Sequence, residues 1–346
     1  MRIAHVALVI YPVPPETYGG TERVIADLAY AQHELGYEVT AFASVDSRLE
    51  GIEVIGRYRS LTAAERDFDG RLPPGFPAEL EAAQLADIAR LKTKFDVIHL
   101  HGSAHASGIC AALGVPTFRT IHWRADEPDH QLHFQNFPNE RVIAISNRQA
   151  QDIPRNVLAG VVHHGIPINR YTASNSSGEY LTFIGRMTDQ KRPDRAIALA
   201  RSVGLPLRLA GPIDPGNPNY FAKVVVPYLD EKIIHLGSLT DARKQEFFAD
   251  SLALVFPIDW PEPFGLVMIE AMACGVPVIA WDNGSVIEVV EDGLTGIVVN
   301  SSEEAEARFG EIHAIDRALV RNRFERRFSS KRMAQEVVRL YEEAGV

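Results

Sequence analysis

Residues 261–277 read PEPFGLVMIEAMACGVP and carry the strongest signal in the chain. The apolar run 252–256 before them predicts a buried strand, and a helix is expected to start within the stretch. Pro263 is tolerated in a first helical turn, and Gly265 lets a ligand approach the free backbone N–H groups there. Those N–H groups and the helix dipole favour a bound phosphate or carboxylate.

Two glutamates, Glu262 and Glu270, flank this helix start. Eight helical residues rise about 12 Å and turn through about 80° beyond whole turns, so both carboxylates are expected to face one way. That separation exceeds the roughly 5 to 9.5 Å between two carboxylates that flank one scissile bond. It suits an extended ligand with hydroxyl groups at both ends and an anion between them, which is the layout of a nucleotide-diphosphate sugar.

The composition is ordinary for a soluble globular protein, with 46% hydrophobic and 23% charged residues. A chain of 346 residues predicts two domains, and a net charge of −10 argues against nucleic acid as a partner. Cys110 and Cys274 lie in apolar surroundings and indicate reduced core residues of a cytoplasmic protein. The apolar run 1–10 is too short to span a membrane, so no integral membrane segment is expected.

Short apolar runs alternate with helical patterns, which predicts an α/β fold with parallel sheets. The expected strands are 3–9, 38–43, 53–55, 97–100, 117–120, 141–144, 180–184, 207–210, 233–236, 252–256, 278–280 and 296–298. The expected helices are 20–35, 78–92, 103–113, 194–203, 241–249, 265–273, 286–291 and 331–344. Residues 56–79 are expected to be an irregular excursion, and 126–133 a polar loop.

Two such series in tandem predict two Rossmann-like, doubly wound domains that face a cleft, with ligands beyond the carboxyl ends of the strands. The polar segment 168–177 is the expected linker. The expected N-terminal domain is therefore 1–168, and the expected C-terminal domain is 169–330.

The Glu262-x7-Glu270 pattern with Pro263-Phe264-Gly265 resembles the signature of the retaining GT-B glycosyltransferases of family four, also called glycosyl transferases group 1. The resemblance implies the GT-B fold, in which the C-terminal helix, here 331–346, returns to the N-terminal domain.

The resemblance also implies roles for the residues of the motif. Glu262 is expected to contact the donor sugar and Glu270 the ribose, while Phe264, Gly265 and Leu266 offer backbone N–H groups. The alternative is a plain helix start with a capping carboxylate and a structural glutamate.

Three further stretches resemble donor-binding loops of the same family. Gly19 and Gly20 open a helix after the first strand and allow main-chain N–H groups to approach an anion. Arg186 and Lys191 follow the first strand of the second domain and resemble a diphosphate clamp, although Arg192 stands where the family usually has glycine. Such fixed cations favour a leaving diphosphate and would take the place of a metal.

The third stretch resembles the base-binding loop. Leu239 is expected to offer main-chain groups to the base, Asp241 to accept from it and Lys244 to stack under it. Helix N-capping is the alternative role of Asp241. A UDP-linked and a GDP-linked donor both remain open. A fourth loop, 281–288, resembles a Gly-Gly-x-x-Glu loop with Ser285 in place of the second glycine.

His122 follows an expected strand at its carboxyl end and matches a histidine that the family places beside the anomeric carbon of the donor sugar. His99 and His101 share one face of a neighbouring strand. The acidic and histidine residues at 126–133 match no metal-ligand spacing, so no metal site and no cofactor are expected.

The sequence therefore predicts a cytoplasmic, metal-independent, retaining glycosyltransferase, with His122, Arg186, Lys191 and Glu262 as its catalytic residues. The acceptor is expected to be a small molecule, a glycan or a lipid, and peripheral membrane contact stays open. Two alternatives remain, a nucleotide-sugar 2-epimerase of the same architecture and a nucleotide-sugar-binding protein without turnover.

Overall fold

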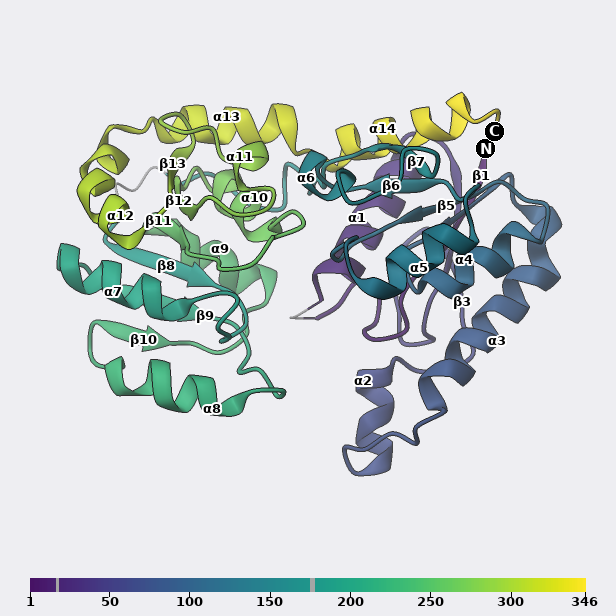
Figure 1. The fold of residues 1–346 in the computed structure, drawn as a ribbon, viewed down its shortest axis with the longest axis horizontal. Coiled ribbons are helices and arrows are strands. Elements are labelled where there is room, and N and C mark those ends of the chain that lie inside the picture. Colours follow the sequence, from purple (N-terminus) through teal and green to yellow (C-terminus); the bar gives the residue numbers. More distant parts are fainter. Residues whose placement is uncertain (17–18, 175–177) are drawn as a thin grey trace. The chain divides into compact units, whose positions relative to one another are not determined.

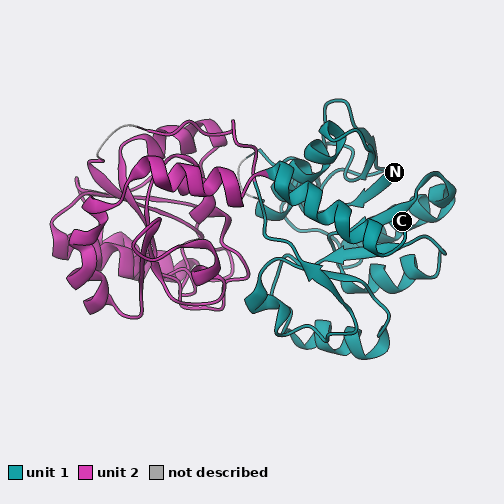
Figure 2. Cartoon of the chain, turned by 90° about the horizontal axis from the view of Figure 1, so that it is seen from above, with its two compact units in different colours: residues 1–165, 330–346 teal, residues 166–329 magenta. Residues whose placement is uncertain are grey.

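The structure is a computed structural model that describes residues 1–16, 19–174 and 178–346. It divides into two compact units, unit 1 of residues 1–165 with 330–346, and unit 2 of residues 166–329 (Figure 2). The domain boundaries expected from the sequence, after residues 168 and 330, lie three residues and one residue later in the chain than the boundaries of these units. The expected linker 168–177 belongs to unit 2 as far as Ser174, and residues 175–177 lie outside the described part.

Unit 1 contains a parallel sheet in the order β3-β2-β1-β4-β5-β6-β7 (Figure 1). Its strands are β1 (Arg2–Val6), β2 (Glu38–Phe42), β3 (Glu53–Ile55), β4 (Val97–Leu100), β5 (Thr117–Thr120), β6 (Val142–Ala144) and β7 (Leu158–Val161). Strand β7 was not predicted from the sequence, because this edge strand is only partly buried and shows neither a buried apolar run nor alternation. Strand order reverses between β1 and β4, and such a switch point opens a crevice at the carboxyl ends.

Helices cover both faces of this sheet because its strands are apolar on both faces. Val39 and Ala41 of β2 join the core cluster that contains residues of α1, whereas Phe42 joins the cluster that contains residues of α3 and α4. The helical elements are α1 (Gly20–Glu34), α2 (Leu61–Ala64), η1 (Glu65–Phe68), α3 (Phe76–Leu91), η2 (Lys92–Lys94), α4 (Ala104–Ala111), α5 (Pro128–Asn136), α6 (Asn147–Ala150) and α14 (Ser330–Glu343).

The C-terminal helix α14 belongs to unit 1, where it packs against α1 (Figure 1). It buries an apolar stripe that includes Met333, Val337 and Tyr341. This return of the chain to its first unit is the arrangement expected of the GT-B fold.

Two expectations about loops in unit 1 were wrong. Residues 126–133 are not a polar loop, because most of them form α5, which starts with Pro128 in its first turn and buries His133 and Phe134. The 56–79 excursion contains α2 and η1 and the start of α3. In both cases few apolar residues are buried, so hydrophobic periodicity is weak.

Unit 2 contains a parallel sheet in the order β10-β9-β8-β11-β12-β13. Its strands are β8 (Tyr180–Ile184), β9 (Leu207–Ala210), β10 (Ile233–His235), β11 (Ser251–Phe256), β12 (Val278–Trp281) and β13 (Gly296–Val299). The switch point lies between β8 and β11, which are hydrogen-bonded neighbours.

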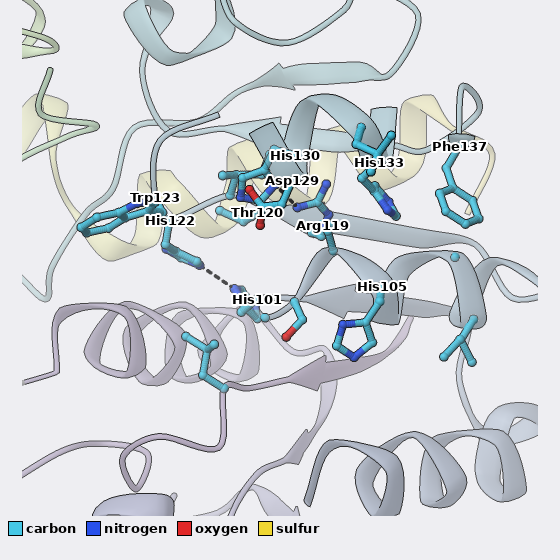
Figure 3. A pocket seen from close by; sticks show the side chains of 18 of the residues that line it. His101, His105, Arg119, Thr120, His122, Trp123, Asp129, His130, His133 and Phe137 are labelled. Carbon is cyan, nitrogen blue, oxygen red and sulfur yellow. Dashed lines mark hydrogen bonds between the residues drawn. The ribbon is translucent and has the colours of Figure 1, made fainter. Parts of the chain in front are cut away.

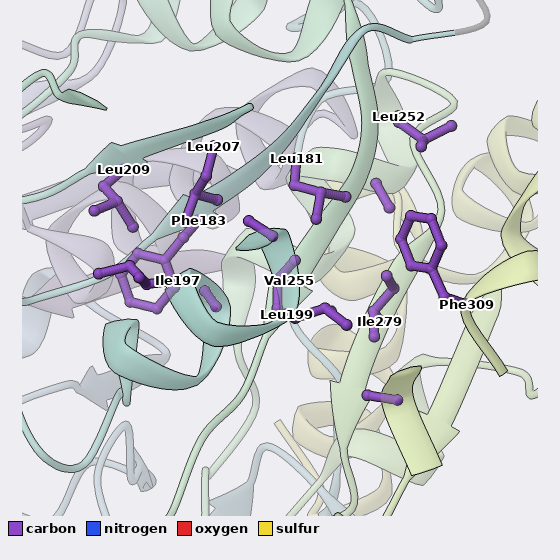
Figure 4. Close-up of a cluster of buried hydrophobic side chains, with 14 of the residues drawn as sticks. Leu181, Phe183, Ile197, Leu199, Leu207, Leu209, Leu252, Val255, Ile279 and Phe309 are labelled. Carbon is purple, nitrogen blue, oxygen red and sulfur yellow. The ribbon is translucent and has the colours of Figure 1, made fainter. Parts of the chain in front are cut away.

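The core of unit 2 lies between this sheet and its helices. Figure 4 shows leucine, isoleucine, valine and phenylalanine side chains of β8, β9, β11, β12 and α7 meeting in one cluster. The helical elements are α7 (Pro193–Val203), α8 (Pro218–Tyr220), η3 (Phe221–Val225), η4 (Val226–Tyr228), α9 (Asp241–Ala249), α10 (Leu266–Ala273), α11 (Val286–Val289), α12 (Ser302–Arg308), η5 (Phe309–Ala314) and α13 (Arg317–Arg327).

Helices α12 and α13 were not predicted from the sequence, because they are largely polar: α13 buries only Val320 and Phe324. Among the described residues, no helix is both long enough and apolar enough to cross a bilayer.

Candidate functional site

The switch point of unit 2 brings together two loops that are far apart in the sequence. One loop follows β8 and the other follows β11, and the Asp259 N–H donates a hydrogen bond of 2.8 Å to the Gln190 carbonyl. Arg192 and Arg195 both pair with the Asp259 carboxylate, at 2.7 and 3.1 Å. The two loops are therefore held as one surface beyond the carboxyl ends of β8 and β11.

Lys191 and Glu262 meet on this surface. The Lys191 ammonium forms an ion pair with Oε2 of Glu262, and Nε1 of Trp260 donates to the same oxygen at 2.7 Å. Lys191 Nζ also lies 4.9 Å from the centre of the Trp260 ring, a cation–π contact. Glu262 is buried, where an unpaired carboxylate would be costly. The Lys191 ammonium and the indole N–H of Trp260 supply its partners.

Arg186 lies at the end of β8 and is half-buried. Within the described parts of the chain, its guanidinium has no ion pair and no hydrogen bond. A guanidinium in this position can bind a phosphate group through two N–H donors without giving up a protein partner.

Arg192 explains a departure from the family pattern. Its φ is 52°, a left-handed conformation that glycine adopts at little cost. The arginine is held there by Asp194, at 2.8 Å, and by Asp259. The loop thus keeps a conformation suited to glycine, with two ion pairs offsetting the strain.

The expected geometry of the two glutamates was wrong. Helix α10 begins at Leu266, after Gly265 at φ 81°, so Glu262 and Pro263 precede the helix and only Glu270 lies in it. The rise and rotation of eight helical residues therefore do not describe the relation of the two carboxylates.

A second loop holds the backbone of Glu262 in place. Ser285 N–H donates to the Glu262 carbonyl at 3.0 Å, and Ser285 Oγ donates to the Phe264 carbonyl at 2.9 Å. Gly284 packs so closely that a Cβ there would lie 2.3 Å from the backbone of Glu262. Ser285, in place of the second glycine of the family pattern, therefore acts as a clamp on the motif.

Phe264 and the start of α10 have separate roles. The Phe264 ring is buried and packs edge-on against Phe328, with ring centres 6.1 Å apart. Only the backbone of this residue is therefore suited to a ligand. Gly265 and Leu266 are half-buried, and first-turn N–H groups such as theirs lack partners within the helix.

Glu270 lies one turn into α10 and pairs with Lys244 of α9. The ammonium donates to both carboxylate oxygens, at 2.7 and 2.9 Å, and Tyr171 Oη lies 3.5 Å from Oε1. Lys244 is therefore held by Glu270 and does not extend freely. A freely extended side chain is what stacking of Lys244 under a base would require. Tyr171 was missed by the sequence analysis, since it lies in the expected linker.

Asp241 is not the N-cap of α9. The cap is Thr240, which accepts a hydrogen bond from Arg243 N–H at 3.4 Å, and Asp241 is the first helical residue. Tyr171 Oη donates to Asp241 at 3.3 Å, so Tyr171 links Asp241 to Glu270. Leu239, one residue before the cap, is buried.

In unit 1, Gly19 and Gly20 lie at the start of α1. Gly19 has φ 139°, and a Cβ there would lie 2.9 Å from Pro15. Glu22, in the first helical turn, is buried, and burial raises the pKa of its carboxyl. Tyr18, which precedes this loop, lies outside the described residues.

His122 lines a cavity of about 1330 Å³ in unit 1 (Figure 3). The cavity lies beyond β4 and β5 and between α4 and α5. Nε2 of His122 lies 3.0 Å from Nδ1 of His101, whereas its Nδ1 is buried and has no hydrogen-bond partner among the described residues. Burial lowers the pKa of His122 to about 3, so the ring is neutral at pH 7.

A chain of imidazoles continues from His122 into the core. His101 Nε2 lies 2.9 Å from His5 Nδ1, and His5 Nε2 lies 2.6 Å from Gln32 Oε1. With Oε1 of Gln32 assigned as an acceptor, His5 donates to it, His101 donates to His5 and His122 donates to His101. The unpartnered Nδ1 of His122 then carries a lone pair and no proton.

His5 and the partners of His99 were not predicted from the sequence. The His99 ring is hydrogen-bonded to Tyr341 at 2.5 Å and to Thr120 at 2.7 Å. The parallel register of β1 and β4 places His5 opposite His99, and only that pairing could have revealed the contact. His5, His99 and His101 have nitrogens within 4.8 Å of one another, close enough to hold a metal. Each ring already has hydrogen-bonded partners, which a cation would have to replace.

The two parallel-sheet units and the donor-type loops at a switch point define the GT-B class of glycosyltransferases. Two family models match adjoining parts of the chain: Glycosyltransferase Family 4 matches residues 18–170, and Glycosyl transferases group 1 matches residues 168–329. The chain belongs to this glycosyltransferase family.

Two relatives match along most of this chain. The D-inositol 3-phosphate glycosyltransferase of Rhodococcus erythropolis is 27% identical over 81% of this chain and 75% of its own length. The alpha-maltose-1-phosphate synthase of Mycolicibacterium smegmatis is 26% identical over 88% of both chains.

Solved structures share the fold. The Anabaena protein Alr3699/HepE in complex with UDP and glucose has a TM-score of 0.75, with 20% identity and 100% of both chains covered. AviGT4, a glycosyltransferase involved in avilamycin A biosynthesis, has a TM-score of 0.73, with 21% identity over 100% of this chain and 98% of its own.

Proposed function

We propose that the chain transfers a sugar from a UDP- or GDP-linked sugar to an acceptor hydroxyl, with retention of configuration and without a metal. The observation that carries this proposal is the surface at the β8–β11 switch point. There, Lys191 and Glu262 are paired, and Arg186, two residues after β8, is a cation with no ion pair among the described residues. A similar fold in complex with UDP and glucose supports a nucleotide-sugar donor.

In the proposed complex, groups of the donor replace the protein partners of these residues. Glu262 accepts from a hydroxyl of the sugar, and Lys191 and Arg186 bind the diphosphate. Glu270 accepts from the ribose hydroxyls, while the backbone N–H groups at Gly265 and Leu266 face the phosphates. Leu239 and Asp241 border the base. The ion pairs to Lys191 and Lys244 hold both carboxylates in position before the donor binds.

We infer a same-face reaction for the chemical step. The bond between the anomeric carbon and the phosphate oxygen breaks, and the bond to the acceptor oxygen forms on the same face. The acceptor proton moves to the departing phosphate oxygen. Fixed cations at Arg186 and Lys191 stabilise the charge that develops on the diphosphate. His122, neutral and with a low pKa, is a poor proton acceptor, which fits a step that needs no protein base.

A cytoplasmic location is part of this proposal. Cys110 and Cys274 are both free and buried. Burial raises the pKa of the two thiols to about 11 and about 12, which keeps them protonated and unreactive.

Single substitutions at the switch point test the function. Arg186→Ala and Glu270→Ala should each lower the rate of sugar transfer by about 100-fold or more, since each removes a contact to the donor. Arg201→Ala, an exposed arginine on α7, is the matched control and should leave the rate unchanged. Circular dichroism checks that the variants fold. Near-wild-type transfer by both Arg186→Ala and Glu270→Ala would refute the proposed site.

The assay needs a donor, which a thermal-shift screen of UDP, GDP, ADP and their common sugars identifies through stabilisation of the native state. A product formed from the donor alone, inverted at C2 of the sugar, would instead establish an epimerase. Tight donor binding with neither transfer nor hydrolysis would establish a binding protein.

A further inference from the structure

The cavity of unit 1 has walls whose chemistry indicates what it binds. It opens beyond the carboxyl ends of β4 and β5, with α4 on one side and α5 on the other (Figure 3). Its volume of about 1330 Å³ exceeds that of a single sugar ring, so a ligand larger than a monosaccharide fits. The inference below rests on the proposed glycosyl transfer, because it assigns this cavity to the acceptor.

Exposed apolar side chains gather at the cavity. Of the fourteen large apolar side chains that are exposed within the described residues, five line it: Ile10, Ile109, Trp123, Leu132 and Phe137. Leu132 is 61% exposed and Phe137 41%. Single exposed apolar residues are common, but a group of them around one hollow indicates a surface that an apolar ligand covers.

The cavity offers no unpaired lysine or arginine among the described residues that line it. Among the described residues that line the cavity, Arg119 is the only lysine or arginine. It is fully buried and donates to both oxygens of Glu140, at 2.5 and 2.9 Å. A bound phosphate would have to break this pair and leave Glu140 buried and uncompensated, which is costly.

The histidines do not supply the missing charge. Nε2 of His105 lies 2.9 Å from Oε2 of Glu81, so this nitrogen already has a carboxylate as its partner. Burial lowers the pKa of His130 and His133, which favours their neutral forms at pH 7. A phosphate group in the cavity would therefore meet no spare positive charge.

Asp129 supplies a negative charge instead. It is exposed at the cavity, and among the described residues its carboxylate forms no hydrogen bond and no ion pair. A carboxylate repels phosphate and accepts hydrogen bonds from hydroxyl groups.

We propose that this cavity binds an uncharged, hydroxyl-bearing acceptor with an apolar body, and that it discriminates against phosphorylated acceptors. The apolar body lies against Leu132, Phe137 and Ile109, and hydroxyl groups of the acceptor donate to Asp129. Specificity thus has two sources: the apolar walls attract acceptors with an apolar body, and the Asp129 carboxylate repels phosphorylated acceptors.

Three glucose derivatives separate the two parts of this proposal. Phenyl β-D-glucopyranoside carries an apolar body, methyl β-D-glucopyranoside carries almost none, and glucose 1-phosphate carries a phosphate. With the donor found by the screen, phenyl glucoside should be used at least about tenfold better than methyl glucoside, because its ring buries apolar surface. Glucose 1-phosphate should be used least. Preferred use of glucose 1-phosphate would overturn the proposal.

Variants place the effect in the cavity. Leu132→Asn and Phe137→Asn should each lower kcat/KM for phenyl glucoside about tenfold while donor binding stays unchanged. Ile287→Asn is the matched control, since Ile287 is 64% exposed and lies in unit 2. Asp129→Lys should raise the use of glucose 1-phosphate about tenfold. Variants at Leu132 and Phe137 that match the Ile287 control would overturn the proposal.

Calorimetry without donor separates this proposal from the proposed function. If phenyl glucoside binds and Phe137→Asn weakens it, but no sugar is ever transferred, the cavity assignment stands and glycosyl transfer fails. If another acceptor is glycosylated while phenyl glucoside neither binds nor reacts, glycosyl transfer stands and the cavity assignment fails.

Discussion

At the scale of single residues, the site depends on how the backbone of Glu262 is held. Glu262 precedes α10, so no helix fixes its position. Gly284 and Ser285 do so from a loop after β12, through a close backbone approach and two hydrogen bonds. Gly284 has φ 66°, and its missing side chain leaves room for the Glu262 backbone. A glycine is therefore required there for two independent reasons.

Gly284→Ala should destabilise the protein by about 2 kcal/mol or more and also weaken donor binding. Gly293→Ala is the matched control, because Gly293 has φ 74° but a Cβ there would meet nothing within 4 Å. Gly293→Ala should lower the free energy of unfolding by only about 1 kcal/mol, from conformational strain alone. Thermal unfolding and nucleotide titration measure both effects. Equal behaviour of the two variants would show that close approach to Glu262 has no consequence.

At the scale of elements, strands β1, β4 and β5 bring histidines together in the core of unit 1. Parallel pairing places His5 of β1 opposite His99 of β4, and His101 continues the line beyond β4. His5 is hydrogen-bonded to His101 and to Gln32 of α1, whereas His99 is hydrogen-bonded to Tyr341 of α14 and stacks on the His101 ring. Burial lowers the pKa of all three, to about 4 for His5. The network is therefore neutral at pH 7.

This network predicts that stability falls in mild acid. Below pH about 6.5 these histidines take up protons in the unfolded state but not in the folded state. Each then lowers the free energy of unfolding by about 1.4 kcal/mol per pH unit, down to the folded-state pKa, about 4 for His5. Unfolding in urea at several pH values between 7 and 5 measures the slope.

His5→Gln should reduce this slope by about one histidine's share, whatever its effect on stability at pH 7. His313→Gln, at an exposed position in unit 2, should leave the slope as it is in the natural chain. A slope unchanged by His5→Gln would mean that His5 is protonated in the folded protein.

At the scale of the whole molecule, the chain leaves unit 1 and returns to it. Unit 1 is completed only when α14, the last helix, packs against α1. This helix buries five large side chains, Met333, Val337, Val338, Leu340 and Tyr341. At about 1.5 to 3 kcal/mol each, their burial is comparable with the whole stability of a domain.

A chain that ends at Ser329 should therefore fail to fold its first unit, while the second unit stays folded and still binds the nucleotide. Limited proteolysis with mass spectrometry should show cleavage throughout residues 1–165 and protection of 166–329. A chain that ends at Glu343 keeps α14 complete and is the control. Protection of 1–165 in the shorter chain would contradict this prediction.

The architecture and the chemical content of the donor-type loops could be predicted from the amino-acid sequence. Most strands, and the helices with a strong apolar stripe, follow from periodicity, since burial of apolar residues dictates their spacing. The family resemblance found Glu262, Glu270, Arg186 and Lys191, because local motifs carry it.

Which residues become partners follows from the three-dimensional fold and could not be predicted from the sequence. The pairing of Glu262 with Lys191, and of Glu270 with Lys244, depends on which strands are neighbours at the switch point. The imidazole chain and the cavity between α4 and α5 depend in the same way on strand order. Hydrophobic patterning records how far each residue is buried, but contact between distant segments is set by the register and order of strands, which no local pattern encodes.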